Sequence, residues 1–165
     1  IPMALSSSTN INASIPEVIE ATAAREVAES LAARAQGELV DHSVSGDAAS
    51  PTVTMTVSIS GERLPSFLSS IIKNGLKVTI TEDWKYTSGA DQAEAELSAQ
   101  VGGVPVSFSG TETLKAQGDA TEMSFTGDVK SGIPLLGSKI AKHAEPMVER
   151  ILSARAEAIS AQIAK

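Results

Sequence analysis

A succession of alternating segments, followed by one long helical segment, constrains the fold of this chain more than any other feature. Between residues 38 and 133, apolar and polar residues alternate, as is typical of antiparallel strands with one buried and one solvent-exposed face. Gly102-Gly103 forms a short connection that favours a hairpin, and Gly110 and Gly127 lie inside strands, where glycine indicates a bulge or bend. A curved antiparallel sheet is therefore expected, with six strands over residues 38–45, 52–60, 76–87, 93–101, 104–114 and 121–133.

A seventh strand and a helical region precede this series. Residues 8–15 alternate between apolar and polar and predict the first strand. Ser14 and Glu17 have the spacing of a capping box, which predicts a helix start directly after that strand. The helical pattern is interrupted near Thr22, which favours two short helices, and Gly37 is expected to end the second one in a left-handed conformation.

The C-terminal segment predicts one long helix. It is expected to begin at Pro134 and to continue to the end of the chain. Pro146 lies inside it and removes the hydrogen bond to the carbonyl of Lys142, so a kink is expected there. A long helix laid on a curved sheet either fills the hollow of the sheet or covers it. The central apolar stripe of this helix is formed by Leu136, Ile140, Ala144, Met147, Ile151 and Ala158.

A second amphipathic pattern separates the strands expected at 52–60 and 76–87. Leu64, Phe67, Leu68 and Ile71 have the spacing of one helix face, so a short helix is expected over 64–72. One hypothesis makes this helix a lid over a cavity mouth, able to touch a membrane or a donor when it opens. The alternative is a small cap that packs on the core.

Composition excludes several classes of function. The chain has 165 residues, a net charge of −7 at pH 7, no cysteine and 3% aromatic residues. Nucleic acid is not an expected partner, because it requires clustered basic residues and aromatic stacking platforms. With two histidines distant in sequence and no cysteine, neither a metal site nor a disulfide is expected, and no cofactor motif is present.

The same features bear on location and domain organisation. No apolar run approaches the ~20 residues of a membrane span, and no secretory signal is recognisable, so a cytoplasmic protein without stable membrane insertion is expected. The length suits one domain covering residues 1–165. Residues 1–7 are expected to be disordered or to come from the expression vector.

The order of the elements resembles the START-like (SRPBCC, helix-grip) superfamily, and local sequences are similar to an actinobacterial family of unknown function. This resemblance implies an α+β fold, in which a curved seven-stranded antiparallel sheet wraps around a long C-terminal helix and two short helices follow the first strand. It also implies a deep apolar cavity between sheet and helix. The motifs that carry it are Ser14-Ile15-Pro16-Glu17, Glu82-Asp83-Trp84, Gly103-Val104-Pro105-Val106 and Gly132-Ile133-Pro134-Leu135-Leu136-Gly137.

Three polar residues share the apolar faces of the expected strands, namely His42, Glu82 and Glu112. Burial raises the pKa of a carboxyl group, and a nearby imidazole could complete an acid–base pair, as a cyclase or aromatase requires. These side chains could instead bind the polar end of a ligand, turn to water at a bulge, or bond to one another structurally. No residue is therefore assigned as catalytic.

The leading hypothesis is binding of a hydrophobic small molecule such as a lipid, isoprenoid or polyketide, for carriage or sequestration. The alternatives are a cyclase-like or aromatase-like acid–base enzyme, and a protein-interaction module whose cavity is filled by its own side chains. The volume of the interior distinguishes binding from interaction, because only the interaction module has a cavity filled by its own side chains. The expected cavity wall consists of Val57, Ile80, Trp84, Leu97, Phe108, Phe125, Met147 and Ile151.

Overall fold

The computed structural model describes residues 3–64, 66–69, 72–102, 104–132 and 137–165. For residues 3–5, 67–68, 131, 137–138, 140–141, 144–145 and 147–148 it describes the backbone alone. The helix start expected at Pro134 and the lid residue Ile71 lie outside the described residues, as do the side chains of Phe67, Leu68 and Met147.

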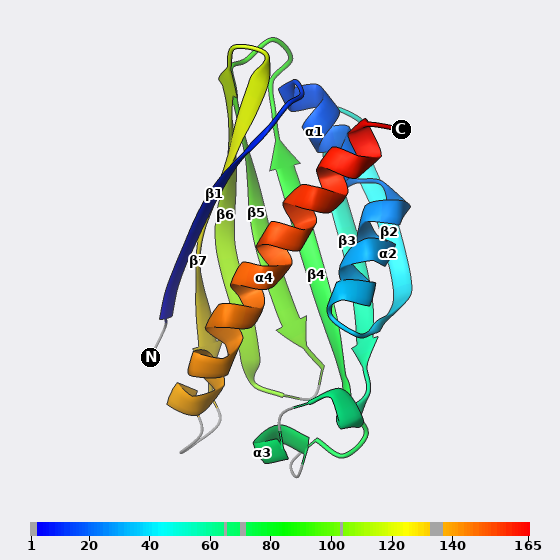
Figure 1. Ribbon diagram of the computed structural model, residues 1–165, viewed down its shortest axis with the longest axis vertical. Coiled ribbons are helices and arrows are strands. Elements are labelled where there is room, and N and C mark those ends of the chain that lie inside the picture. The colour runs from blue at the N-terminus through cyan, green and yellow to red at the C-terminus, as the bar shows by residue number, and fades with distance from the viewer. Residues whose placement is uncertain (1–2, 65, 70–71, 103, 133–136) are drawn as a thin grey trace.

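Seven antiparallel strands form one sheet in the order β1-β7-β6-β5-β4-β3-β2. Strands β2 to β7 follow one another as neighbours, and β1 pairs with β7 at the other end of the sheet (Figure 1). This arrangement confirms the expected curved antiparallel sheet. The strands are β1 (Met3–Ile11), β2 (Glu38–Asp47), β3 (Ser50–Ile59), β4 (Leu76–Lys85), β5 (Gln92–Val101), β6 (Val106–Gln117) and β7 (Ala120–Ser131).

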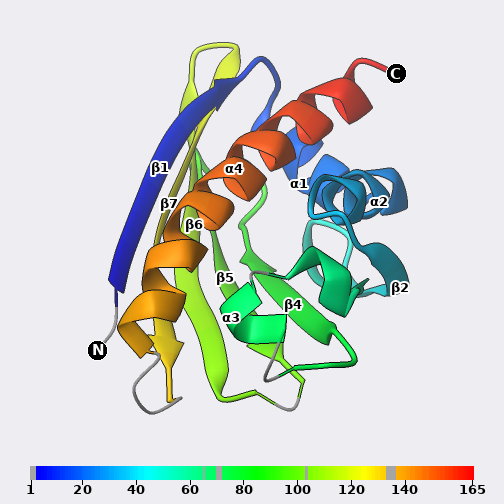
Figure 2. The ribbon, with the colours of Figure 1, turned by 60° about the horizontal axis from the view of Figure 1, so that its bottom comes forward.

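The helices lie on one side of this sheet. Helix α4 crosses its concave face diagonally and packs against α1, α2, β1 and β7 (Figure 1). Figure 2 shows the sheet curving around α4, with α3 near one open end. The expected helix-grip architecture, including the two short helices after the first strand, is confirmed. The helices are α1 (Ile15–Thr22), α2 (Arg25–Arg34), α3 (Ser66–Ser69) and α4 (Gly137–Ile163).

The expected capping box at the start of α1 is present. The Ser14 hydroxyl accepts a hydrogen bond from the backbone N–H of Glu17, and the Glu17 carboxylate accepts one from the backbone N–H of Ser14 at 3.2 Å. Two of the N–H groups left free at a helix start are thereby satisfied. Helix α4 continues through Pro146 as a helix, and the kink expected there stays a prediction.

Two boundaries near the N-terminus differ from those expected. Strand β1 begins at Met3, which lies opposite Val129 of β7, so residues 3–7 belong to the sheet. The left-handed residue after α2 is Gln36, with φ of 58°, and not Gly37. Gly37 is needed for another reason, because a Cβ atom there would lie 2.7 Å from the Cγ1 atom of Val57.

Strand β2 departs from strict alternation. Its pairing with β3 shifts between Leu39 and Asp41, so Leu39 packs on the core and Val40 is 49% exposed. Val44 lies opposite the buried Val53 but is 48% exposed, because β2 is an edge strand. Strict alternation over residues 38–45 would place Val40, His42 and Val44 on one face; the shift takes Val40 out of that face, and Val44 stays on the inner face without being buried.

The segment between β3 and β4 is less helical than expected. A 3₁₀ turn covers Gly61–Arg63, and the half-buried Leu64 follows it. Helix α3 is a single turn over Ser66–Ser69, so the described part of the expected 64–72 helix is much shorter. Among the described residues, no helix combines the length and apolar character needed to cross a membrane.

Candidate functional site

Two glutamates and one arginine meet in the interior between sheet and α4. Glu82 on β4 lies opposite Leu97 of β5, and Glu112 on β6 lies opposite Ala95 of the same strand. Both glutamates are therefore on the inner face, two strands apart, and the small side chain of Ala95 leaves room above β5. Arg155 reaches them from α4, and only 4%, 1% and 8% of Glu82, Glu112 and Arg155 are exposed.

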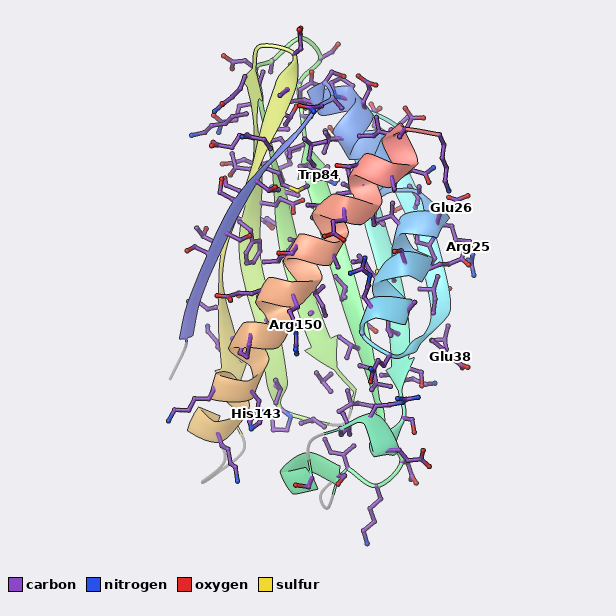
Figure 3. All side chains as sticks on the ribbon, in the orientation of Figure 1. Arg25, Glu26, Glu38, Trp84, His143 and Arg150 are labelled. Atoms are coloured by element: carbon purple, nitrogen blue, oxygen red, sulfur yellow. The ribbon has the colours of Figure 1, made fainter. Side chains whose placement is uncertain are left out.

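Arg155 joins the two carboxyl groups. Its Nη1 donates to Glu112 Oε2 and its Nη2 donates to Glu82 Oε2. The indole Nε1–H of Trp84 donates to Glu82 Oε1 at 2.8 Å and to Thr22 Oγ1 at 3.0 Å. Figure 3 shows Trp84 at the level of the upper half of α4. We call Glu82, Glu112 and Arg155 the charge cluster; its contacts link β4, β6, α1 and α4.

The cluster holds two acids and one base, so its protonation depends on burial. Burial raises the pKa of Glu82 to about 8, against the opposing charge of Arg155, and the neighbouring carboxyl group of Glu112 raises it further. Burial alone would lower the pKa of Arg155, but Glu112 and Glu82 together raise it, so the guanidinium stays charged. Burial therefore favours the protonated form of Glu82 at neutral pH.

The sequence-predicted acid–base residues are brought together only in part. Glu82 and Glu112 share the charge cluster, but His42 lies opposite Met55 on β3, whose own partner on β4 is Ile80. With strands ~4.8 Å apart, His42 is about 10 Å from β4. The buried Nε2 of His42 has no hydrogen-bond partner among the described residues. The imidazole therefore does not join the carboxyl groups in this structure.

Arg155 was not among the residues expected from the sequence, although a signal for it existed. It lies four residues after Ile151 and four before Ile159, which places it on the same face of α4. Ile159 is fully buried, so this face is directed at the sheet. A cation on a buried helix face indicates a buried anion opposite, and two such anions were already recognisable on the strands.

The residues expected to line a cavity separate into two groups. Val57, Leu97 and Phe125 are buried, and Trp84, also buried, uses its N–H within the protein. Toward the end of the sheet near α3, apolar residues of the inner face are only partly buried. These are Val78, Ile80, Ala99, Val101, Val106 and Phe108, together with Ile151 and Leu152 of α4.

Hollows lined by described residues include one on the sheet and one beside α4. One of about 840 Å³ lies on the outer face of β4 to β7 and is lined largely by hydroxyl and carboxylate groups, such as those of Thr81, Ser109 and Asp128. Leu97 also borders it. The other, of about 540 Å³, lies between β1 and α4. Within the described part of the chain, no three histidine, cysteine or acidic residues are grouped in a way that could hold a metal ion.

A family model matches residues 6–163, which is almost the whole chain. The chain belongs to the family described as "Protein of unknown function (DUF2505)". A search of curated protein sequences found no match.

Solved structures with the same architecture cover nearly the full chain. TTHA0849 from Thermus thermophilus has a TM-score of 0.60 and 13% identity, covering 98% of this chain and 97% of that chain. The Zhui aromatase/cyclase from Streptomyces sp. R1128 has a TM-score of 0.54 and 12% identity, covering 99% and 92%. Norcoclaurine synthase from Thalictrum flavum has a TM-score of 0.52 and 14% identity, covering 100% and 88%. At these identities the likeness establishes a START-like, helix-grip fold, and the activities of those proteins stay their own.

Proposed function

We propose that this chain binds a hydrophobic small molecule, such as a lipid, isoprenoid or polyketide, between the sheet and α4, for carriage or sequestration in the cytoplasm. The observation that carries the proposal is the partial exposure of apolar side chains that face inward. Ile80 and Phe108 lie on the concave face, yet both stay partly exposed, as does Ile151 of α4. When a ligand covers apolar surface that faces a helix but is still in contact with solvent, the free energy of the system falls by about 25 cal/mol per Å² removed from water.

In this proposal the ligand occupies the half of the interior nearer α3. Val57, Leu97, Phe125 and Trp84 form the buried support of that space, and Met147 would complete its wall from α4. The lid would consist of Leu64, Phe67, Leu68 and Ile71, which precede β4 in the sequence. Brief contact of this segment with a membrane would allow ligand exchange.

A fluorescence titration with the neutral probe N-phenyl-1-naphthylamine tests the proposal. Ala99 is a partly buried inner-face residue, and its neighbour Gln100 points to the outer face. Ala99→Leu should weaken probe binding several-fold because it fills the space, whereas the matched control Gln100→Leu should bind like the wild type. A wild-type protein that leaves the probe unbound, or an Ala99→Leu variant with unchanged affinity, would contradict the proposal.

An acid–base enzyme is the second candidate, and the raised pKa of Glu82 favours it. A carboxyl group that titrates near neutral pH can donate and accept a proton at similar cost. The reaction class would be proton transfer at a carbon next to a carbonyl group. NMR detection of deuterium uptake by a bound hydrophobic ketone, compared between wild type and Glu82→Gln, tests this. Exchange that is equally slow in both proteins and in buffer alone would remove the enzyme hypothesis.

A further inference from the structure

The charge cluster lies at the inner end of the partly exposed apolar surface. Glu82 and Ile80 are two residues apart on the same face of β4, about 6.6 Å along the strand. Arg155 and Ile151 are one turn apart on α4, about 6 Å along the helix axis. On the other side of the cluster the core is closed, with Leu114 and Ile159 fully buried. An elongated ligand that enters from the α3 end would therefore meet the cluster with its leading end.

The cluster has more hydrogen-bond acceptors than donors. Two carboxyl groups offer roughly eight acceptor positions when ionised. Among the described residues, the donors that reach them are two N–H groups of Arg155 and the indole N–H of Trp84, and the protonated form of Glu82 adds its own O–H. The Thr22 hydroxyl contributes none, because it donates to the carbonyl oxygen of Ile19 at 2.6 Å.

One acceptor in the cluster is free of protein donors. Glu112 is 1% exposed, and its buried Oε1 has no hydrogen-bond partner among the described residues. A buried polar atom without a partner costs about 1–3 kcal/mol, and more where it is charged. Because burial favours the protonated form of Glu82, a ligand carboxylate would add a buried negative charge beside Glu112 without a second cation to balance it. Both observations favour a ligand that brings a hydrogen-bond donor.

We propose that the charge cluster recognises the polar end of the bound molecule as a hydrogen-bond donor, a hydroxyl or a protonated amine, and discriminates against carboxylates such as free fatty acids. This inference rests on the proposed function, since it assigns the polar end of a ligand whose apolar part lies along Ile80, Phe108 and Ile151. Glu112 accepts the hydrogen bond through Oε1. Arg155 keeps Glu112 in place through Oε2.

Four ligands that share an unbranched twelve-carbon chain and differ in the group at one end test this assignment: 1-dodecanol, dodecylamine, methyl dodecyl ether and dodecanoate. Each is titrated, below its aggregation limit, against the protein loaded with N-phenyl-1-naphthylamine. Because a hydrogen bond to a charged group changes affinity about tenfold or more, the alcohol and the amine should displace the probe at about tenfold lower concentration than the ether and the carboxylate. Equal displacement by all four, displacement by none, or strongest displacement by dodecanoate would overturn the inference while probe binding upholds the proposed function. Failure of the probe itself to bind would overturn both.

A substitution isolates the role of Glu112. Glu112→Gln keeps an oxygen that can accept from Arg155 but replaces the other acceptor by an NH₂ donor, so the advantage of dodecanol over the ether should disappear. Glu94→Gln, the same chemical change at an exposed position of β5, should keep the advantage. A Glu112→Gln protein that retains the full wild-type preference would overturn the assignment. Because the wild-type ligand series is decisive alone, loss of folding in the variant does not remove the test.

Discussion

The charge cluster is the residue-scale feature that most distinguishes this interior from a simple apolar core. Arg155 is flanked in sequence by the small buried residues Ala154 and Ala156, and its guanidinium reaches both glutamates. Removing charges from water has a large free-energy penalty, which is offset only when every partner is in place. The cluster therefore makes the attachment of α4 to the sheet dependent on individual side chains.

Arg155→Met should destabilise the protein by about 3–5 kcal/mol, because it leaves two buried carboxyl groups without their cation. The measurement is urea denaturation followed by the fluorescence of Trp84, which is the only tryptophan. The control is Arg150→Met, at an exposed position of the same helix, which should change stability little. A triple variant with Glu82→Leu and Glu112→Leu added should recover much of the loss. Similar stability of Arg155→Met and the wild type would contradict this account.

Stability should also depend on pH through Glu82. The pKa of Glu82 is about 8 in the folded protein against 4.5 for the ordinary carboxyl group, so between these values the folded state holds the proton and the unfolded state has released it. The contribution of Glu82 to the free energy of unfolding therefore has its full stabilising value below pH 4.5. This contribution is lost as the pH rises to about 8. Urea midpoints measured from about pH 5 to 9 should fall more steeply for wild type than for Glu82→Gln. Parallel pH profiles of the two proteins would show that Glu82 does not hold this proton.

At the scale of elements, strands β6 and β7 are joined by an unusual glycine pair. Gly110 and Gly127 lie opposite each other, and the ring of Phe125 occupies the space that their side chains would fill. Phe125 also stacks on Phe108, with ring centroids 5.3 Å apart. Glycine permits this close approach, and the aromatic ring covers the backbone that the missing side chains leave exposed.

Gly110→Ala should destabilise the protein by about 1–3 kcal/mol through overpacking. The new Cβ atom would lie 2.5 Å from the carbonyl oxygen of Thr126 and 2.6 Å from the Cζ atom of Phe125. Gly102→Ala is a suitable control, because its Cβ atom would have an ordinary contact of 3.7 Å with the carbonyl oxygen of Lys77. Thermal denaturation of the two variants provides the measurement. Equal melting temperatures would mean that β6 and β7 can move apart without penalty.

At the scale of the whole molecule, features set by local sequence were predictable and those set by contacts between distant segments were less so. The capping box at Ser14 depends on residues three apart, and it was recognised. The bulge at Val40 depends on how an edge strand meets β3, which alternation does not reveal. The role of Arg155 depends on the position of α4 over β4 and β6, which the sequence pattern does not reveal. The inner-face positions of Glu82 and Glu112 followed from alternation, but their shared cation did not.

The central claim is that the sheet and α4 hold a hydrophobic ligand between them. Native mass spectrometry of the protein purified from its own host tests it most directly. The account predicts a discrete mass increment on the folded protein that disappears on denaturation. A bare mass, unchanged after incubation with long-chain alcohols, amines and polycyclic probes, would contradict it.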